Sequence, residues 1–184
     1  MMNADMNTAS QILDVAERTM RQAGYNAVSY RDIAGEVGIK SASLHYHFPK
    51  KEDLGTALVR RYAEKFRQNL IENIGEQNKS QNKIAAFVLN YRQALEAQGL
   101  ICLCAVLGAE VFGLPASVTA EVKVFFETNL DWLTAQYEEM NKAHPEDHAK
   151  TTLALLEGAM IVSAVNSDMT IFDSAANLIL ADCK

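Results

Sequence analysis

Apolar side chains recur along most of the chain at spacings of three and four residues, which is the pattern of amphipathic helices. The first such stripe covers residues 12–23. A capping-box pattern, Thr8-x-x-Gln11, precedes it, and Gly24 follows it. We therefore expect a first helix that begins near Thr8 and ends at Gly24.

Two very short helices are predicted next. A second capping box, Ser29-x-x-Asp32, opens a helix that ends at Gly38. After a turn of a few residues, residues 41–47 are expected to form a third helix, which ends before Pro49. The fixed φ of Pro49 also suits the first turn of a following helix.

The rest of the chain is also helical in pattern. Apolar residues recur every four positions from Leu54 to Leu70, which predicts a long fourth helix ending at Gly75. Further helices are expected at about residues 81–97, 101–112, 115–141, 146–166 and 171–181. No pair of strands and no internal repeat is apparent, so the sequence predicts an all-α fold of about nine helices.

Composition agrees with a folded protein that stays out of the membrane. The 184 residues are 49% apolar and 22% charged, which is too apolar for a disordered chain. The N-terminal residues lack the pattern of an export signal, and no apolar run is long enough to span a bilayer. With three cysteines, which cannot all pair, we expect a cytoplasmic protein with reduced thiols and no membrane partner.

Charge is distributed unevenly between the two parts of the chain. Residues 1–67 contain ten Lys or Arg and eight Asp or Glu, whereas residues 68–184 contain seven and fifteen. The N-terminal part can therefore approach a polyanion, and the acidic remainder cannot approach one closely.

The two short helices and the turn at Gly38 form a helix-turn-helix pattern. Its third helix would expose its polar positions and could enter the DNA major groove. These positions are Lys40, Ser41, Ser43, His45, Tyr46 and His47. Lys50 and Lys51 follow the helix and suit flanking phosphates. The alternative, a helical hairpin buried in a bundle, fits poorly with so many polar side chains.

The segment SYRDIAGEVGIKSASLHYHFPKKEDL resembles the DNA-binding signature of the TetR family of bacterial transcriptional regulators. The resemblance implies a helix-turn-helix DNA-binding domain over residues 1–50, a linking helix over about 51–74, and a ligand-binding and dimerisation domain over 75–184. It also implies that Ser29, Tyr30 and Arg31 face the phosphate backbone. The residues deepest in the groove would be Lys40, Ser41, Ala42 and Ser43. The next three, His45, Tyr46 and His47, would contact bases and backbone, and Lys51 would hold a phosphate.

Two positions depart from the family pattern. His45 stands where a Tyr is usual, which replaces a phenol by a titratable imidazole. Lys50 stands where a Ser, Asp or Asn usually caps the fourth helix, and such a side-chain cap typically contributes about 1 kcal/mol.

Metal and catalytic chemistry find little support in the sequence. His45 and His47 are two positions apart on a helix, so they point to different sides and cannot easily share an ion. His144 and His148 have better spacing but flank Pro145 in a polar corner, where capping is the expected role. No phosphate loop or nucleophile motif is present. We therefore expect no metal, no cofactor and no enzymatic activity.

The two cysteines in ICLCAVLGAEVFGLP, residues 101–115, allow two interpretations. Cys102 and Cys104 could be small buried apolar residues, which is the commoner role of an unpaired cysteine. Alternatively, Cys102 could sense oxidants or electrophiles, because the run resembles a cysteine-containing subset of TetR regulators, with Ala109-Glu110 present and Ile101 in place of Gly. No basic residue is adjacent in sequence to stabilise a thiolate.

The C-terminal helices provide candidates for an effector pocket and for a dimer interface. Aromatic and thiol side chains suit a pocket for a flat or apolar molecule. The pocket candidates are Tyr91, Cys102, Cys104, Phe112, Phe125 and Trp132. The last two helices have wide apolar faces with small residues, and in the TetR family such a pair packs against its twin. The interface candidates are Leu155, Ala159, Val162, Ser163 and Leu178.

Together these features predict a homodimeric regulator, most simply a repressor, that binds a pseudopalindromic operator in double-stranded DNA and is released by a small-molecule effector. Two alternatives stay open. One is a thiol-based repressor that senses through Cys102, and the other is a helical ligand-binding protein that does not bind DNA.

Overall fold

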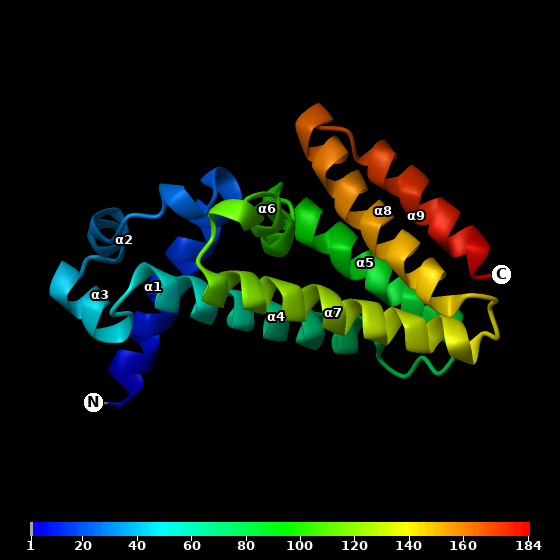
Figure 1. Cartoon of the computed structure of the whole chain (residues 1–184), viewed down its shortest axis with the longest axis horizontal. Helices are drawn as coiled ribbons and strands as arrows, with labels where there is room; N and C mark the ends of the chain where they lie inside the picture. The colour runs from blue at the N-terminus through cyan, green and yellow to red at the C-terminus, as the bar shows by residue number, and fades with distance from the viewer. Residues whose placement is uncertain (1) are drawn as a thin grey trace. The chain divides into compact units, whose positions relative to one another are not determined.

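The computed structural model describes residues 2–184, without the side chains of residues 2–6 and 98. Over this range it contains nine α-helices, two short 3-10 helices and no strand, which confirms the all-α prediction (Figure 1). The elements are α1 (Met2–Ala23), η1 (Tyr25–Ala27), α2 (Tyr30–Val37), α3 (Ser41–His47), α4 (Lys51–Ile74), α5 (Ser80–Gln98), α6 (Leu103–Ala109), η2 (Val111–Gly113), α7 (Ala116–Glu139), α8 (Pro145–Asn166) and α9 (Met169–Asp182).

The chain forms two compact units. The N-terminal unit contains residues up to 63 together with residues 103–123, and the C-terminal unit contains residues 64–102 and 124–184. Helices α4 and α7 each contribute residues to both units. The grouping of α6 and the start of α7 with the N-terminal residues could not be seen in the sequence.

The predicted start of the first helix was wrong. Residues 2–23 are helical, so Thr8 lies inside α1 and does not cap it. The predicted end is confirmed, because Gly24 adopts a φ of 84°, which favours glycine, and its N–H donates to the Met20 carbonyl. Ala23, expected on the apolar face, is exposed at this last turn.

The core of the N-terminal unit forms where α1 packs against α2, α3 and α6. The apolar stripe of α1 is fully buried there through Ile12, Ala16 and Met20. Leu44 of α3 and Leu54 of α4 are buried as well. Helices of seven or eight residues are not stable alone. The burial of these apolar side chains therefore provides most of the free energy that stabilises α2 and α3.

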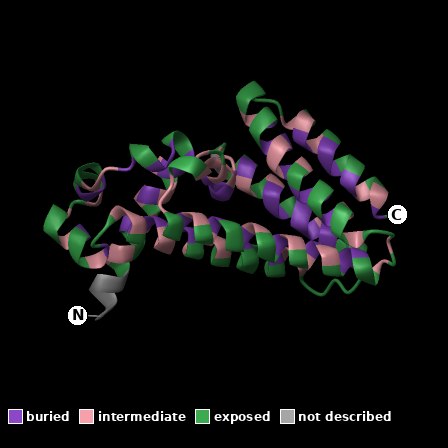
Figure 2. Ribbon diagram, in the orientation of Figure 1, coloured by how far each residue is buried: buried purple, intermediate pink, exposed green. Residues whose placement is uncertain are grey.

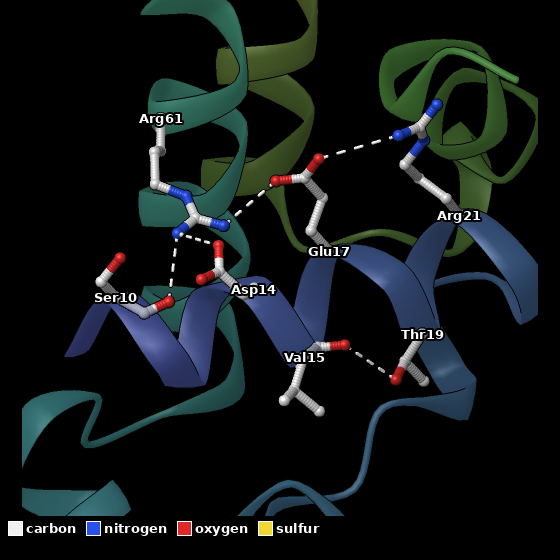
Figure 3. A network of polar contacts seen from close by, with 7 residues as sticks. All are labelled: Ser10, Asp14, Val15, Glu17, Thr19, Arg21 and Arg61. Carbon is white, nitrogen blue, oxygen red and sulfur yellow. Dashed lines mark hydrogen bonds and ion pairs between the residues drawn. The ribbon is translucent and has the colours of Figure 1, made fainter. Parts of the chain in front are cut away.

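A polar network joins α1 to the first half of α4 (Figure 3). The Arg61 guanidinium donates to the Ser10 carbonyl at 3.1 Å, pairs with Asp14 at 2.9 Å and donates to Glu17 at 3.1 Å. Glu17 also pairs with Arg21, one turn further along α1. Planar Arg groups favour such multiple contacts, so the network fixes α4 to α1 through one side chain.

In the C-terminal unit, α8 and α9 lie side by side and both pack against α5 (Figure 1). Buried residues, purple in Figure 2, run along the facing sides of these helices. The largest buried side chains of the unit include Phe87 and Tyr91 of α5, Tyr137 of α7 and Phe172 of α9. Among the helices described, none is both long and apolar enough to cross a membrane.

Candidate nucleic-acid interface

The turn between α2 and α3 has the geometry of a helix-turn-helix. The Ser29 hydroxyl caps α2 by accepting a hydrogen bond from the Asp32 N–H at 3.4 Å, which confirms Ser29 as the N-cap residue of this helix. Gly38 ends α2 with a φ of 77°, and the following N–H, of Ile39, donates to the Ala34 carbonyl at 2.9 Å. This reversal allows α3 to pack against both α1 and α2.

Helix α3 directs one side chain inward and most of the others outward. Leu44 is fully buried, and Phe48 is buried just beyond the helix end. The exposed residues are Lys40, Ser41, Ala42, His45 and Tyr46, whereas Ser43 and His47 are half-buried. Tyr46 exposes 75% of its surface, which is unusual for a large aromatic residue. The predicted DNA-reading positions therefore lie on one accessible helix.

The charge around α3 favours a polyanion. No Asp or Glu occurs between Glu36 and Glu52, while this stretch contains three lysines and two histidines. The Lys50 side chain is 72% exposed and pairs with Glu52 at 3.3 Å. The missing side-chain cap of α4 is partly replaced, because the Lys50 N–H donates to the Asp53 carboxylate at 2.9 Å.

Tyr30 and His45 interact with each other. Their ring centroids are 4.8 Å apart, and the Tyr30 hydroxyl donates to the Phe48 carbonyl at 2.9 Å. Burial, with the nearby Asp53 and Tyr25, raises the pKa of Tyr30 to about 12. The Tyr30 hydroxyl thus joins the start of α2 to the end of α3, an intramolecular role that the sequence did not predict. Arg31, beside it, is exposed.

Lys51, predicted to hold a phosphate, makes contacts within the N-terminal unit. Its ammonium donates to the Asn26 carbonyl at 3.2 Å and lies 4.8 Å from the centre of the Tyr25 ring. Burial lowers the pKa of Lys51, and the charge of Glu110 opposes this shift. A phosphate contact by Lys51 would compete with these interactions.

Glu110, which follows α6, also contacts the connection between α1 and α2. Its Oε2 accepts a hydrogen bond from the Tyr25 N–H at 2.9 Å. A Cβ at Gly24 would lie 1.9 Å from Glu110 Oε1, so a side chain there would displace this carboxylate. The sequence showed Glu110 as part of an Ala-Glu pair, but gave no sign of its partner.

The predicted effector residues are distributed over both units. In the C-terminal unit, the rings of Tyr91 and Phe125 both contact Phe66, and Trp132 stacks on Phe87 at 5.3 Å. Cys104 is buried in α6 of the N-terminal unit. Phe112 is fully exposed in η2, because α6 ends at Ala109 and the expected helix over 101–112 does not continue. Phe112 therefore contributes to no interior surface of the described chain.

Cys102 is 1% exposed, and the Glu157 carboxyl group interacts with its thiol. The Tyr91 hydroxyl donates to Glu157 Oε1 at 3.0 Å. A carboxyl group supplies no positive charge that would stabilise a thiolate, so this neighbourhood does not favour the thiol-sensing interpretation. Glu157 was missed because a single acid within an apolar helix has no distinguishing spacing.

An apolar groove runs between α8 and α9. Four of the predicted interface residues, Leu155, Ala159, Val162 and Leu178, line it. Leu178 is 65% exposed and Val162 is 46% exposed. The fifth, Ser163, is buried and does not line the groove.

The histidines are placed singly rather than in metal-binding groups. His45 Nδ1 lies 3.4 Å from the Pro49 carbonyl, and His148 Nδ1 lies 2.7 Å from Asp182. His144 occupies the N-cap position of α8 without a side-chain hydrogen bond. Within the part of the chain that is described, no three His, Cys, Asp or Glu residues are arranged to hold a metal ion.

The sequence of the chain is similar to those of known regulatory proteins. The sequence model of the bacterial regulatory proteins of the tetR family matches residues 12–58. Two curated relatives are the transcriptional repressor KstR2 of Rhodococcus jostii, 28% identical over 88 residues, and the transcriptional regulator BetI of Brucella anthropi, 32% identical over 92 residues. These matches cover 48% and 50% of this chain but only 43% and 47% of the relatives, so the chain spans under half the length of either.

The similarity to solved structures extends over nearly the whole chain. A crystal structure of a TetR transcriptional regulator from Legionella pneumophila superimposes with a TM-score of 0.89 and 30% sequence identity. That match covers 95% of this chain and 96% of the Legionella chain. The chain therefore belongs to the TetR family of bacterial regulatory proteins.

Proposed function

We propose that the protein is a one-component transcriptional repressor. Its N-terminal unit would bind one half of a pseudopalindromic operator through α3, and a small molecule bound to the C-terminal unit would release the DNA. The observation that carries the proposal is the exposed surface of α3, which has no acidic residue and presents Lys40, Ser41 and Tyr46. Such a surface suits base edges and phosphates in a major groove.

Dimerisation through the groove between α8 and α9 is the second part of the proposal. A recognition helix of seven residues has little affinity alone, so two copies that dock on successive major grooves are needed for tight binding. The exposed apolar side chains of Leu178 and Val162 support this surface, because burying them against a second copy removes them from water.

Effector release would then follow from geometry. Two half-sites in successive major grooves lie roughly 34 Å apart, so a change of a few ångströms in the separation of the recognition helices prevents simultaneous docking. An effector that binds the non-docking state more tightly lowers the DNA-competent fraction.

The test uses three single variants and the DNA upstream of the protein's own gene. Lys40→Ala and Tyr46→Ala should each weaken binding at least about tenfold in a fluorescence-anisotropy titration, since a good base contact contributes about 1–3 kcal/mol. Lys150→Ala, an exposed lysine on α8, is the matched control and should bind as the wild type does. Light scattering should show the same dimer in all four proteins. Equal DNA affinity in all of them would refute the assignment of α3.

A further inference from the structure

A carboxyl group is buried inside the C-terminal unit without full hydrogen bonding. Glu157 lies in α8, and its Oε1 accepts the Tyr91 hydroxyl of α5 at 3.0 Å. Its Oε2 is buried and has no hydrogen-bond partner among the described residues. A buried oxygen left without a partner is destabilising, so this position is unfavourable unless another group occupies it.

Among the described residues, the groups that act on the Glu157 carboxyl include no cation. Burial raises the pKa of Glu157 well above its ordinary value, and the Cys102 thiol adds to the shift, while the Tyr91 hydroxyl opposes it. The nearest basic residue along α5, Arg92, donates to Asp173 of α9 at 2.9 Å and also pairs with Glu96. The Glu157 carboxyl group therefore keeps its proton to a higher pH than an exposed glutamate does.

Aromatic rings continue from this carboxyl group into the unit. The Tyr91 ring lies 5.2 Å from Phe66 and 5.3 Å from Phe87, and Phe87 stacks on Trp132 with an interplanar angle of 15°. Asn129, on α7 between Phe125 and Trp132, has a buried amide nitrogen, Nδ2, without a partner among the described residues. The faces of such rings carry negative potential and attract organic cations.

We propose that the C-terminal unit binds a lipophilic organic cation, with its charge at Glu157 and its apolar body against Tyr91, Phe87 and Trp132. This inference rests on the proposed function, since it names the chemical class of the effector. An anionic ligand would be repelled by the Glu157 carboxylate, and a neutral ligand would leave the group protonated, whereas a cation can pair with the carboxylate where both are excluded from water.

Binding of the cation would be linked to the release of one proton. The O–H bond of the Glu157 carboxylic acid breaks, the proton passes to solvent, and the carboxylate forms an ion pair with the ligand. Because the acid must ionise first, affinity for the cation should rise with pH until Glu157 is ionised in the empty protein as well.

Trp132 is the single tryptophan of the chain, so its fluorescence reports directly on this site. We would titrate the protein with benzyltrimethylammonium and, in parallel, with neopentylbenzene, in which a neutral carbon replaces the charged nitrogen. The cation should change Trp132 fluorescence and bind at least about tenfold more tightly, since the ring faces attract a desolvated cation and not its neutral isostere. Equal affinity for the two probes, or no response to the cation, would overturn the proposal.

Glu157→Gln keeps the shape of the side chain and removes its charge. It should weaken cation binding at least tenfold, leave neopentylbenzene binding unchanged and abolish the rise of affinity between pH 5 and pH 8. Glu146→Gln, an exposed glutamate on the same helix, is the matched control and should retain wild-type binding. Thermal unfolding would verify that both variants are folded. Cation binding that is unchanged in Glu157→Gln would show that the rings act alone, against the proposal.

The binding assay contains no DNA, so the two proposals fail separately. Cation binding without release of operator DNA would support this site and contradict the effector step of the proposed function. Operator binding that is intact, combined with equal affinity for cation and isostere, would support the repressor and refute the cation site.

Discussion

The surface of α3 and the interior around Glu157 are two candidate binding sites of opposite character. Around α3, polar side chains project into solvent, no carboxylate lies within the segment, and Tyr46 is 75% exposed. Around Glu157, one buried acid accepts the Tyr91 hydroxyl and has an oxygen without a hydrogen-bond partner among the described residues. The first site is suited to a large polyanion that approaches from outside, and the second to a small cation that must lose its water.

This difference explains why salt and pH should act on different parts of the molecule. Exposed charges interact over about 8–10 Å at physiological ionic strength and are weakened by salt. A buried acid is little affected by salt, but its protonation state depends on pH and on any cation placed beside it. Variants that separate these effects can therefore test the two sites independently.

The largest effect is expected when the copies of the chain are kept apart. Leu178→Glu places a charge in the apolar groove between α8 and α9, where the proposed second copy would desolvate it. The variant should be monomeric by light scattering and should bind operator DNA about a hundredfold more weakly, because only one recognition helix can dock at a time. Ile71→Glu, on α4, is the matched control, since Ile71 is also an exposed apolar residue. A monomer that binds as tightly as the wild type would contradict the dimer proposal.

A second prediction compares two acidic residues of the N-terminal unit, Glu110 with a part-buried hydrogen bond and Glu36 with an exposed ion pair. Glu110→Ala leaves the Tyr25 N–H without its acceptor and should lower the free energy of unfolding by about 1–3 kcal/mol. Glu36→Ala removes only an exposed ion pair with Arg18 and should cost less than about 1 kcal/mol. Urea denaturation of both variants makes the comparison. Similar losses would show that Glu110 is not a structural contact of the α1–α2 connection.

A third prediction concerns the pH dependence of stability in Glu157→Gln without ligand. The folded-state pKa of Glu157 is raised, so the wild type binds this proton more tightly when folded and loses that stability as pH rises through the folded pKa. Relative to the wild type, the variant should therefore be more stable at pH 8 than at pH 5. Urea denaturation at both values measures this change, and Glu146→Gln, at an exposed glutamate of the same helix, is the matched control. A constant difference between wild type and Glu157→Gln would contradict a buried, protonated carboxyl group.

The sequence predicted the helix-turn-helix well because its determinants are local. Capping by Ser29, the positive φ of Gly38 and the inward position of Leu44 each follow from neighbouring residues. The start of α1 was predicted wrongly because the pattern Thr8-x-x-Gln11 can occur inside a helix as well as at its beginning. The sequence around Thr8 does not distinguish these two positions. Likewise, no local pattern could show that Tyr30 donates to Phe48.

Contacts between distant segments account for what remained hidden. Glu110 and Tyr25 are 85 positions apart, and Tyr91 and Glu157 are 66 positions apart. Their pairing depends on how whole helices pack, which apolar periodicity does not specify. Residue types alone predicted an aromatic interior in the C-terminal unit, but not which of its rings would adjoin an acid.

The most direct test of the central claim is the dependence of operator affinity on salt. If α3 and its flanking lysine dock on DNA, the logarithm of the binding constant should fall steeply and linearly with the logarithm of salt concentration, as counterions leave the phosphates. Lys50→Ala should make this slope shallower by about one, because one phosphate contact is lost, and Lys150→Ala should leave it unchanged. A flat salt response in the wild type would contradict DNA binding through this surface.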